Sequence, residues 1–179
     1  MRKLVLLAAF AAGLALALHF SKRPKGEGDL YAKSVLGKKG PKLVVEKWIH
    51  GPPPTEGKFV LVDFWAAWCP PCRQTIPELN RIAKKFADRL VVIGISGESE
   101  SAVKNFRNPR IEYYVGIDPQ ERMARELEVR AIPYVILMDP QGIVRWEGNP
   151  LVPSRRLSEA VIEQILRGER GDGSAPGEG

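Results

Sequence analysis

Residues 62–73 read VDFWAAWCPPCR and place two cysteines, Cys69 and Cys72, on either side of two prolines. Upstream, residues 59–65 are nearly all apolar, which is typical of a central strand covered on both faces. Downstream, apolar side chains recur every three or four positions over residues 72–86, which predicts an amphipathic helix. The two cysteines are therefore expected where a strand meets the start of a helix.

This position suits thiol chemistry. A helix start concentrates unpaired backbone N–H groups and a partial positive charge, which together favour the thiolate of a cysteine placed there. Cys69 is that cysteine and is expected to be the nucleophile. Cys72 lies one helical turn further on and can attack a mixed disulfide formed at Cys69, which releases the partner. Pro70 and Pro71 remove two backbone donors and stiffen the turn.

The composition argues against a metal centre. The chain has 2 cysteines and 2 histidines, and a tetrahedral zinc site would need all four, including His19 from an apolar N-terminal segment. No metal or cofactor is therefore expected. Two cysteines three positions apart also cannot join distant parts of a fold. Redox exchange with other molecules is the favoured use of the pair, and an inert disulfide is the alternative.

The formal net charge of +6 is located before the predicted domain. Residues 1–42 hold nine Lys or Arg and two acidic residues, a net +7, so the rest of the chain carries −1. No basic stripe runs through the folded part, which argues against a nucleic-acid surface. The basic segment instead reads as a solvated linker close to a membrane.

The N-terminal segment has the pattern of an export signal. An apolar run over residues 4–20 follows Met1, Arg2 and Lys3. Residues 1–20 are expected to form a signal peptide or a hydrophobic helix that anchors the protein in the membrane, with the domain on the extracytoplasmic (periplasmic) side. A retained anchor is favoured, and cleavage near residues 15–17 is the alternative. Basic residues within 22–25 would favour a cytoplasmic domain under the positive-inside rule, which is the competing topology.

The remaining chain divides into a basic flexible linker over residues 21–42, one domain over 43–167 and a Gly-rich disordered tail over 168–179. Ser154 is expected to cap the closing helix of the domain. Besides the segments described above, strands are predicted over residues 43–49, 90–95, 111–117, 134–138 and 143–146, and helices over 99–106, 123–127 and 157–166. This order predicts an α/β fold with a mixed central sheet and helices on both faces.

The segment 62–73, with Pro77 after it, resembles the active-site segment of thioredoxin. The chain over residues 43–166 resembles the membrane-anchored TlpA/ResA-type branch of that family, and the stretch 105–128 resembles the extra strand and helix of that branch. The resemblance implies a thioredoxin-like fold and thiol-disulfide oxidoreductase activity.

The resemblance also implies roles for further residues. Asp63 matches the buried acid that assists proton transfer at the resolving cysteine. A carboxylate inside an apolar strand is costly unless it is functional or paired, which favours the same role, and an aspartate hydrogen-bonded near a strand end is the alternative. Trp68 matches an aromatic residue beside the site, where Pro70 also lies. Ile132 and Pro133 match the cis-proline segment that pairs with an extended substrate.

The expected function is reduction of disulfides in client proteins outside the cytoplasm, with electrons taken from a membrane thiol-disulfide donor. The same cysteines could serve an oxidant or isomerase, because direction depends on potential and partner. A thiol peroxidase is a further alternative, but the Thr or Ser expected shortly before a peroxidatic cysteine is absent upstream of Cys69. A binding module that keeps the fold without catalysis is the last alternative. No acidic residue besides Asp63 can be assigned to the site.

Overall fold

The computed structural model describes residues 31–168. The expected signal or anchor over residues 1–20, the first part of the linker and nearly all of the tail lie outside that range. Within residues 31–168, every helix is too short or too polar to cross a membrane.

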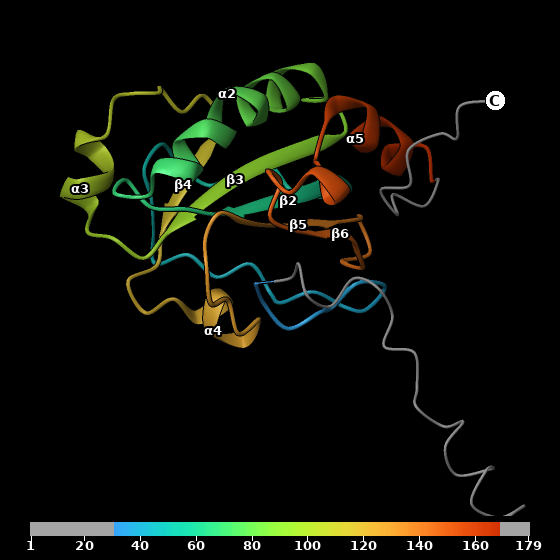
Figure 1. The fold of residues 1–179 in the computed structure, drawn as a ribbon, viewed down its shortest axis with the longest axis horizontal. Coiled ribbons are helices and arrows are strands. Elements are labelled where there is room, and N and C mark those ends of the chain that lie inside the picture. Colours follow the sequence, from blue (N-terminus) through green and yellow to red (C-terminus); the bar gives the residue numbers. More distant parts are fainter. Residues whose placement is uncertain (1–30, 169–179) are drawn as a thin grey trace, which may run out of the picture.

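A six-stranded mixed sheet forms the centre of the molecule (Figure 1). The strand order is β1-β4-β3-β2-β5-β6, in which β2 pairs parallel to β3 and antiparallel to β5, and β3 pairs parallel to β4. The two outer pairs, β1 with β4 and β5 with β6, are antiparallel. The strands span Lys47–Trp48 (β1), Phe59–Phe64 (β2), Leu90–Ser96 (β3), Tyr114–Ile117 (β4), Tyr134–Met138 (β5) and Val144–Gly148 (β6). The mixed sheet confirms the predicted fold class.

Helices cover both faces of this sheet (Figure 1). One face carries α2 (Pro70–Lys85) and α5 (Glu159–Leu166), with α3 (Glu100–Asn105) near the β4 end, and the other carries α4 (Arg122–Glu126). A short 3-10 turn, η2 (Pro153–Arg155), precedes α5. The helix α2 continues past Pro77 to Lys85.

Alternate residues of β2 supply two separate cores. Leu61 faces the α2 side and belongs to a cluster with Ile76 and Ile162, whereas Val62 faces the other side and clusters with Met123. This two-residue alternation is the normal consequence of strand geometry. Asp63 therefore lies on the same face as Leu61, underneath α2.

The expected strand over residues 43–49 is wrong in its first half, because β1 comprises only Lys47–Trp48. The preceding apolar residues pack instead of pairing. Val45 lies over Gly116, where an added Cβ would come within 2.7 Å of the valine side chain, and the backbone N–H of Val44 points at the sulfur of Met123 at 3.3 Å. Apolar side chains used for such packing give the same sequence pattern as a buried strand.

Residues 31–42, which the sequence places in the linker, lie against the domain. The backbone N–H of Gly37 donates to the carbonyl of Val144 at 2.8 Å. The backbone N–H of Val35 donates to the carboxylate of Glu147, also at 2.8 Å, and this carboxylate is buried. The segment thus supplies polar partners to β6.

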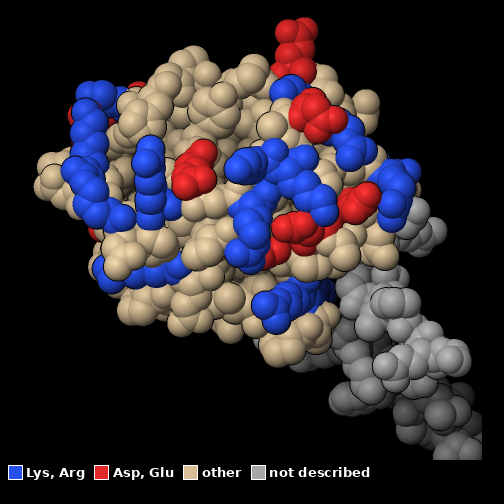
Figure 2. Space-filling view, turned by 90° about the horizontal axis from the view of Figure 1, so that it is seen from above, with Lys and Arg blue, Asp and Glu red and all other residues tan. Residues whose placement is uncertain are grey.

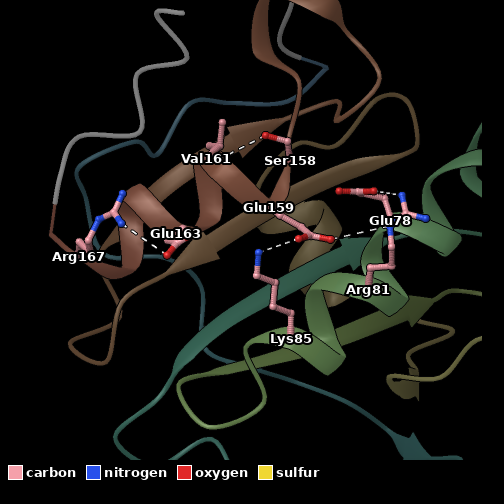
Figure 3. Close-up of polar contacts among 8 residues, drawn as sticks. All are labelled: Glu78, Arg81, Lys85, Ser158, Glu159, Val161, Glu163 and Arg167. Carbon is pink, nitrogen blue, oxygen red and sulfur yellow. Dashed lines mark hydrogen bonds and ion pairs between the residues drawn. The ribbon is translucent and has the colours of Figure 1, made fainter. Parts of the chain in front are cut away.

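Polar contacts join α5 to α2 (Figure 3). Glu159 accepts from Lys85 at 2.8 Å and lies 3.9 Å from Arg81. The helix α5 is capped by Ser158, whose Oγ accepts from the backbone N–H of Val161 at 3.4 Å. The expected cap at Ser154 is wrong, because that residue lies inside the 3-10 turn η2, which ends before the helix begins.

The side of the molecule that carries α2 and α5 shows Lys and Arg side chains interspersed with Asp and Glu (Figure 2). The positive charge on this side does not form a continuous stripe. Interspersed charges of both signs are ordinary for the exposed face of a folded domain.

Candidate active site

Cys69 and Cys72 are joined by a disulfide with an S–S distance of 2.08 Å. Cys69 is the N-cap of α2, and Pro70 and Pro71 fill the first two helical positions. Proline is well suited to the start of a helix, because the N–H groups there have no partner within the helix. The backbone N–H of Cys72 is therefore the first donor of the helix, and it points at Cys69 Sγ at 3.2 Å. The strand-to-helix junction lies where the sequence predicts it.

The two sulfurs differ in access. Cys72 has no exposed surface, whereas Cys69 is 2% exposed and lines a cavity of about 620 Å³ beside the active-site loop. Trp68 stands out of the surface with 68% of its area exposed. A client thiol or disulfide can thus approach Cys69 from the cavity and cannot approach Cys72 in this state.

Three of the four expected substrate-contacting residues meet at this cavity, because Trp68, Pro70 and Ile132 all line it. The carbonyl oxygen of Ile132 lies 3.8 Å from Cys69 Sγ, and the peptide bond from Ile132 to Pro133 is cis. Pro133 itself is buried and opens the turn into β5. The arrangement leaves the backbone carbonyl of residue 132 close to the reactive sulfur.

Asp63 is completely buried on β2, opposite Gly94 of β3 and Val135 of β5. Its Oδ2 accepts a hydrogen bond of 3.3 Å from the hydroxyl of Tyr113, while Oδ1 has no partner within residues 31–168. Burial raises the pKa of the Asp63 carboxyl to about 7, and the hydrogen bond from Tyr113 opposes that rise. A group with such a pKa can accept or give up a proton near neutral pH.

Ala67, the residue just before Trp68, is held through both of its backbone polar groups. The backbone N–H of Ala67 donates to Glu98 Oε2 at 2.5 Å, and the carbonyl of Ala67 accepts from Arg73 Nη2 at 2.7 Å. The guanidinium of Arg73 lies 5.6 Å from the ring centroid of Phe106. These contacts fix the loop that carries Cys69, and sequence reasoning missed both charged residues.

The cavity beside Cys69 also has charged walls that the sequence did not reveal. Glu98 and Glu121 line it together with Arg125 and Arg130. Asp118, which forms an ion pair with Arg122, also lines it. Glu98 and Glu121 come from different loops, so no sequence spacing links them. Within residues 31–168, no cluster of three or more His, Cys, Asp or Glu side chains could hold a metal ion.

Residues 53–147 match the model of the AhpC/TSA family. The chain belongs to this family. It is also similar to the thiol-disulfide oxidoreductase ResA of Bacillus thuringiensis, with 31% identity over 119 residues that cover 63% of this chain and 68% of that protein. The thioredoxin-like protein YneN of Bacillus subtilis is 29% identical over 94 residues, which span 50% of this chain and 55% of YneN.

A solved structure agrees with these relatives. A crystal structure from Chlorobium tepidum, provisionally named thiol:disulfide interchange protein DsbE, superposes with a TM-score of 0.62 and 29% identity, covering 74% of this chain and 96% of that one. The fold is therefore thioredoxin-like, as predicted. The family and the two cysteines at this spacing identify the chain as a thiol-disulfide oxidoreductase, which exchanges with proteins that contain thiols or disulfides.

Proposed function

We propose that this oxidoreductase works as a reductant of client disulfides. The observation that carries the proposal is that a single backbone N–H, that of Cys72, reaches the Cys69 sulfur, because Pro70 and Pro71 have none. A strongly oxidising enzyme needs a reduced form that is unusually stabilised. With a single backbone donor at its sulfur, Cys69 lacks that stabilisation. The disulfide is then the stable form, which makes the dithiol a reductant.

In the proposed reaction, the Cys69 thiolate attacks the client disulfide, and one client sulfur leaves as a thiolate. The mixed disulfide is resolved when Cys72 passes its proton to Asp63 and attacks Cys69, so that the second client thiolate leaves. The client gains two electrons and the enzyme ends as the Cys69–Cys72 disulfide. Trp68, Pro70, Ile132 and Pro133 hold the extended client segment, with the residue 132 backbone pairing with it.

We also propose that the enzyme acts outside the cytoplasm, held at the membrane by residues 1–20 and reduced again by a membrane thiol-disulfide donor. The apolar run over residues 4–20 behind a basic start supports this placement. Labelling a cysteine introduced at exposed position Glu56 with a membrane-impermeant reagent in whole cells would test it, in a background with Cys69 and Cys72 changed to Ser. Labelling only after lysis would contradict an extracytoplasmic domain.

The direction of exchange is tested by a pair of single-turnover reactions. Reduced enzyme is mixed with an oxidised protein client, and oxidised enzyme with the reduced client, while tryptophan fluorescence follows the redox state. A reductant transfers electrons to the client nearly to completion in the first reaction and reacts little in the second. The opposite pattern would make the enzyme an oxidant of client thiols.

A further inference from the structure

Tyr113 lies outside β3 and β5, the two strands that flank Asp63, and still contacts the Asp63 carboxyl. Its hydroxyl donates to Asp63 Oδ2 at 3.3 Å, although the two residues are 50 positions apart. Tyr113 is 6% exposed and lies in the chain segment just before β4, packed in the cluster under α2. This is the one hydrogen bond that the carboxyl makes within residues 31–168, because Oδ1 has no partner there.

Gly94 makes this approach possible. It lies directly opposite Asp63 in the sheet. A Cβ atom at position 94 would come within 3.0 Å of Tyr113 Cε2 and within 2.9 Å of Trp65 Nε1. The missing side chain thus leaves the space in which the tyrosine and tryptophan rings converge beside the carboxyl. A tyrosine placed by such close packing can hold its hydroxyl in one position.

We propose that Tyr113 is a positioning residue for Asp63, which fixes the carboxylate so that its free oxygen accepts the proton of Cys72. This inference rests on the proposed role of Asp63 in resolution. Tyr113 occupies Oδ2, and Oδ1 has no hydrogen-bond partner within residues 31–168. A hydrogen bond to the ionised form also favours that form over the neutral acid.

The proton and electron balance of the step is simple. The S–H bond of Cys72 breaks and its proton goes to Asp63, while the freed electron pair on the Cys72 sulfur forms the bond to Cys69. The bond from Cys69 to the client sulfur breaks, and the client leaves as a thiolate. Tyr113 exchanges no proton and no electron, which is why its effect must appear through Asp63.

The surroundings of Asp63 offer few other influences. On its face of the sheet, β3 presents Gly94 and β5 presents Val135, and neither titrates. The buried positions nearest the start of α2 are Cys72 and Thr75, and the hydroxyl of Thr75 donates to the Cys72 carbonyl at 2.8 Å. Tyr113 is the side chain that adjusts the pKa of Asp63 against the effect of burial. The pH response of this carboxyl should therefore depend on Tyr113.

The test measures the resolving step in the full chain as a function of pH. At saturating client disulfide, stopped-flow release of the second client thiol reports this step. For the unaltered protein we expect a rate that rises through a midpoint near the pKa of Asp63. Tyr113→Phe should move that midpoint up by about one pH unit, so that the step is about tenfold slower at pH 6 and nearly unchanged above pH 9. Tyr114→Phe is the matched control, because Tyr114 is the exposed neighbour on β4.

Two further proteins separate the possible failures. If Asp63→Asn leaves the pH profile intact, the proposed role of Asp63 is wrong and not merely that of Tyr113. If Asp63→Asn removes the acid limb while Tyr113→Phe leaves its midpoint unchanged, the positioning role is overturned. The same holds if Tyr113→Phe slows the step equally at all pH values, or if it still acts in the Asp63→Asn background.

If the Tyr113→Phe protein does not fold, a second substitution at position 113 provides the test. Incorporation of 3-fluorotyrosine at position 113 keeps the ring and makes the hydroxyl a stronger donor. The stronger hydrogen bond should stabilise the carboxylate and move the midpoint to lower pH, opposite to the effect of phenylalanine. An unchanged midpoint in the fluorinated protein would overturn the inference on its own.

Discussion

The carboxylate of Glu98 accepts a hydrogen bond of 2.5 Å from the backbone N–H of Ala67, and this contact ties the loop after β3 to the loop that carries Cys69. Removing it in Glu98→Ala leaves a half-buried N–H without its charged partner. We expect a loss of about 1–3 kcal/mol in the free energy of unfolding of the disulfide form, measured in urea. Glu56→Ala, at an exposed loop position, should change it by less than about 0.5 kcal/mol.

The unequal access of the two sulfurs predicts different behaviour of their serine variants. Cys72→Ser should accumulate a mixed disulfide between Cys69 and the client, because the resolving thiol is missing. Cys69→Ser should form none and should not exchange disulfides, since Cys72 is fully buried. Non-reducing gel electrophoresis with a disulfide client measures both. Equal trapping by the two variants would refute the assignment of nucleophile and resolving cysteine.

The ionisation of Asp63 predicts a pH-dependent stability. Its pKa is about 7 in the folded protein against an ordinary value of 3.8, so the folded state binds more protons between these values. The stability set by this group is full below pH 3.8 and falls as the pH rises toward 7, by about 4 kcal/mol in total. Asp63→Asn removes the ionisation and should unfold later in urea than the unaltered protein at pH 8, with a much smaller difference at pH 4.

The control for this experiment is Asp88→Asn, because the Asp88 side chain is 71% exposed and its ion pair with Arg89 spans 3.6 Å. Its stability difference from the unaltered protein should be small at both pH values. If the Asp63→Asn protein is no more stable than the unaltered one at pH 8, ionisation of Asp63 does not destabilise the folded state. That result would contradict the prediction.

The two prolines of the active-site turn predict a tunable reduction potential. An N-cap side chain can accept from the second or third helical N–H, and Pro71 removes the second. Pro71→Ala restores this donor for the Cys69 thiolate, which should make the potential less negative by about 10–30 mV. Equilibration with glutathione measures it, and Pro52→Ala, at an exposed proline outside the site, should leave it unchanged. A shift in the opposite direction would contradict the account of the turn.

Local patterns were sufficient to predict the parts of the fold in which neighbours in sequence are neighbours in space. The strand and helix around Cys69 and Cys72, the hairpin of β5 and β6, and the closing helix follow from periodicity and turn residues. The expected strand over residues 43–49 is too long, because apolar side chains that pack on a surface give the same sequence pattern as strand residues. Residue type alone points to Ser154 as a cap, but it cannot locate the first helical turn, which follows Ser158.

The supporting residues of the site could not be predicted. Glu98 meets Ala67 across 31 positions and Tyr113 meets Asp63 across 50, and no periodicity connects either pair. Gly94, which gives Tyr113 its space, looks in the sequence like any small residue in a strand. These contacts depend on how β3 and the segment before β4 lie in the sheet, which the order of elements does not specify.

The reduction potential of the full-length protein tests the central claim most directly. Equilibration with dithiothreitol and glutathione buffers, followed by alkylation of free thiols, gives the ratio of the Cys69–Cys72 disulfide to the dithiol. We predict a potential near that of thioredoxin, about −270 mV, which would make the protein a reductant of client disulfides. A value near about −120 mV, as in DsbA, would contradict the account and make the protein an oxidant of client thiols.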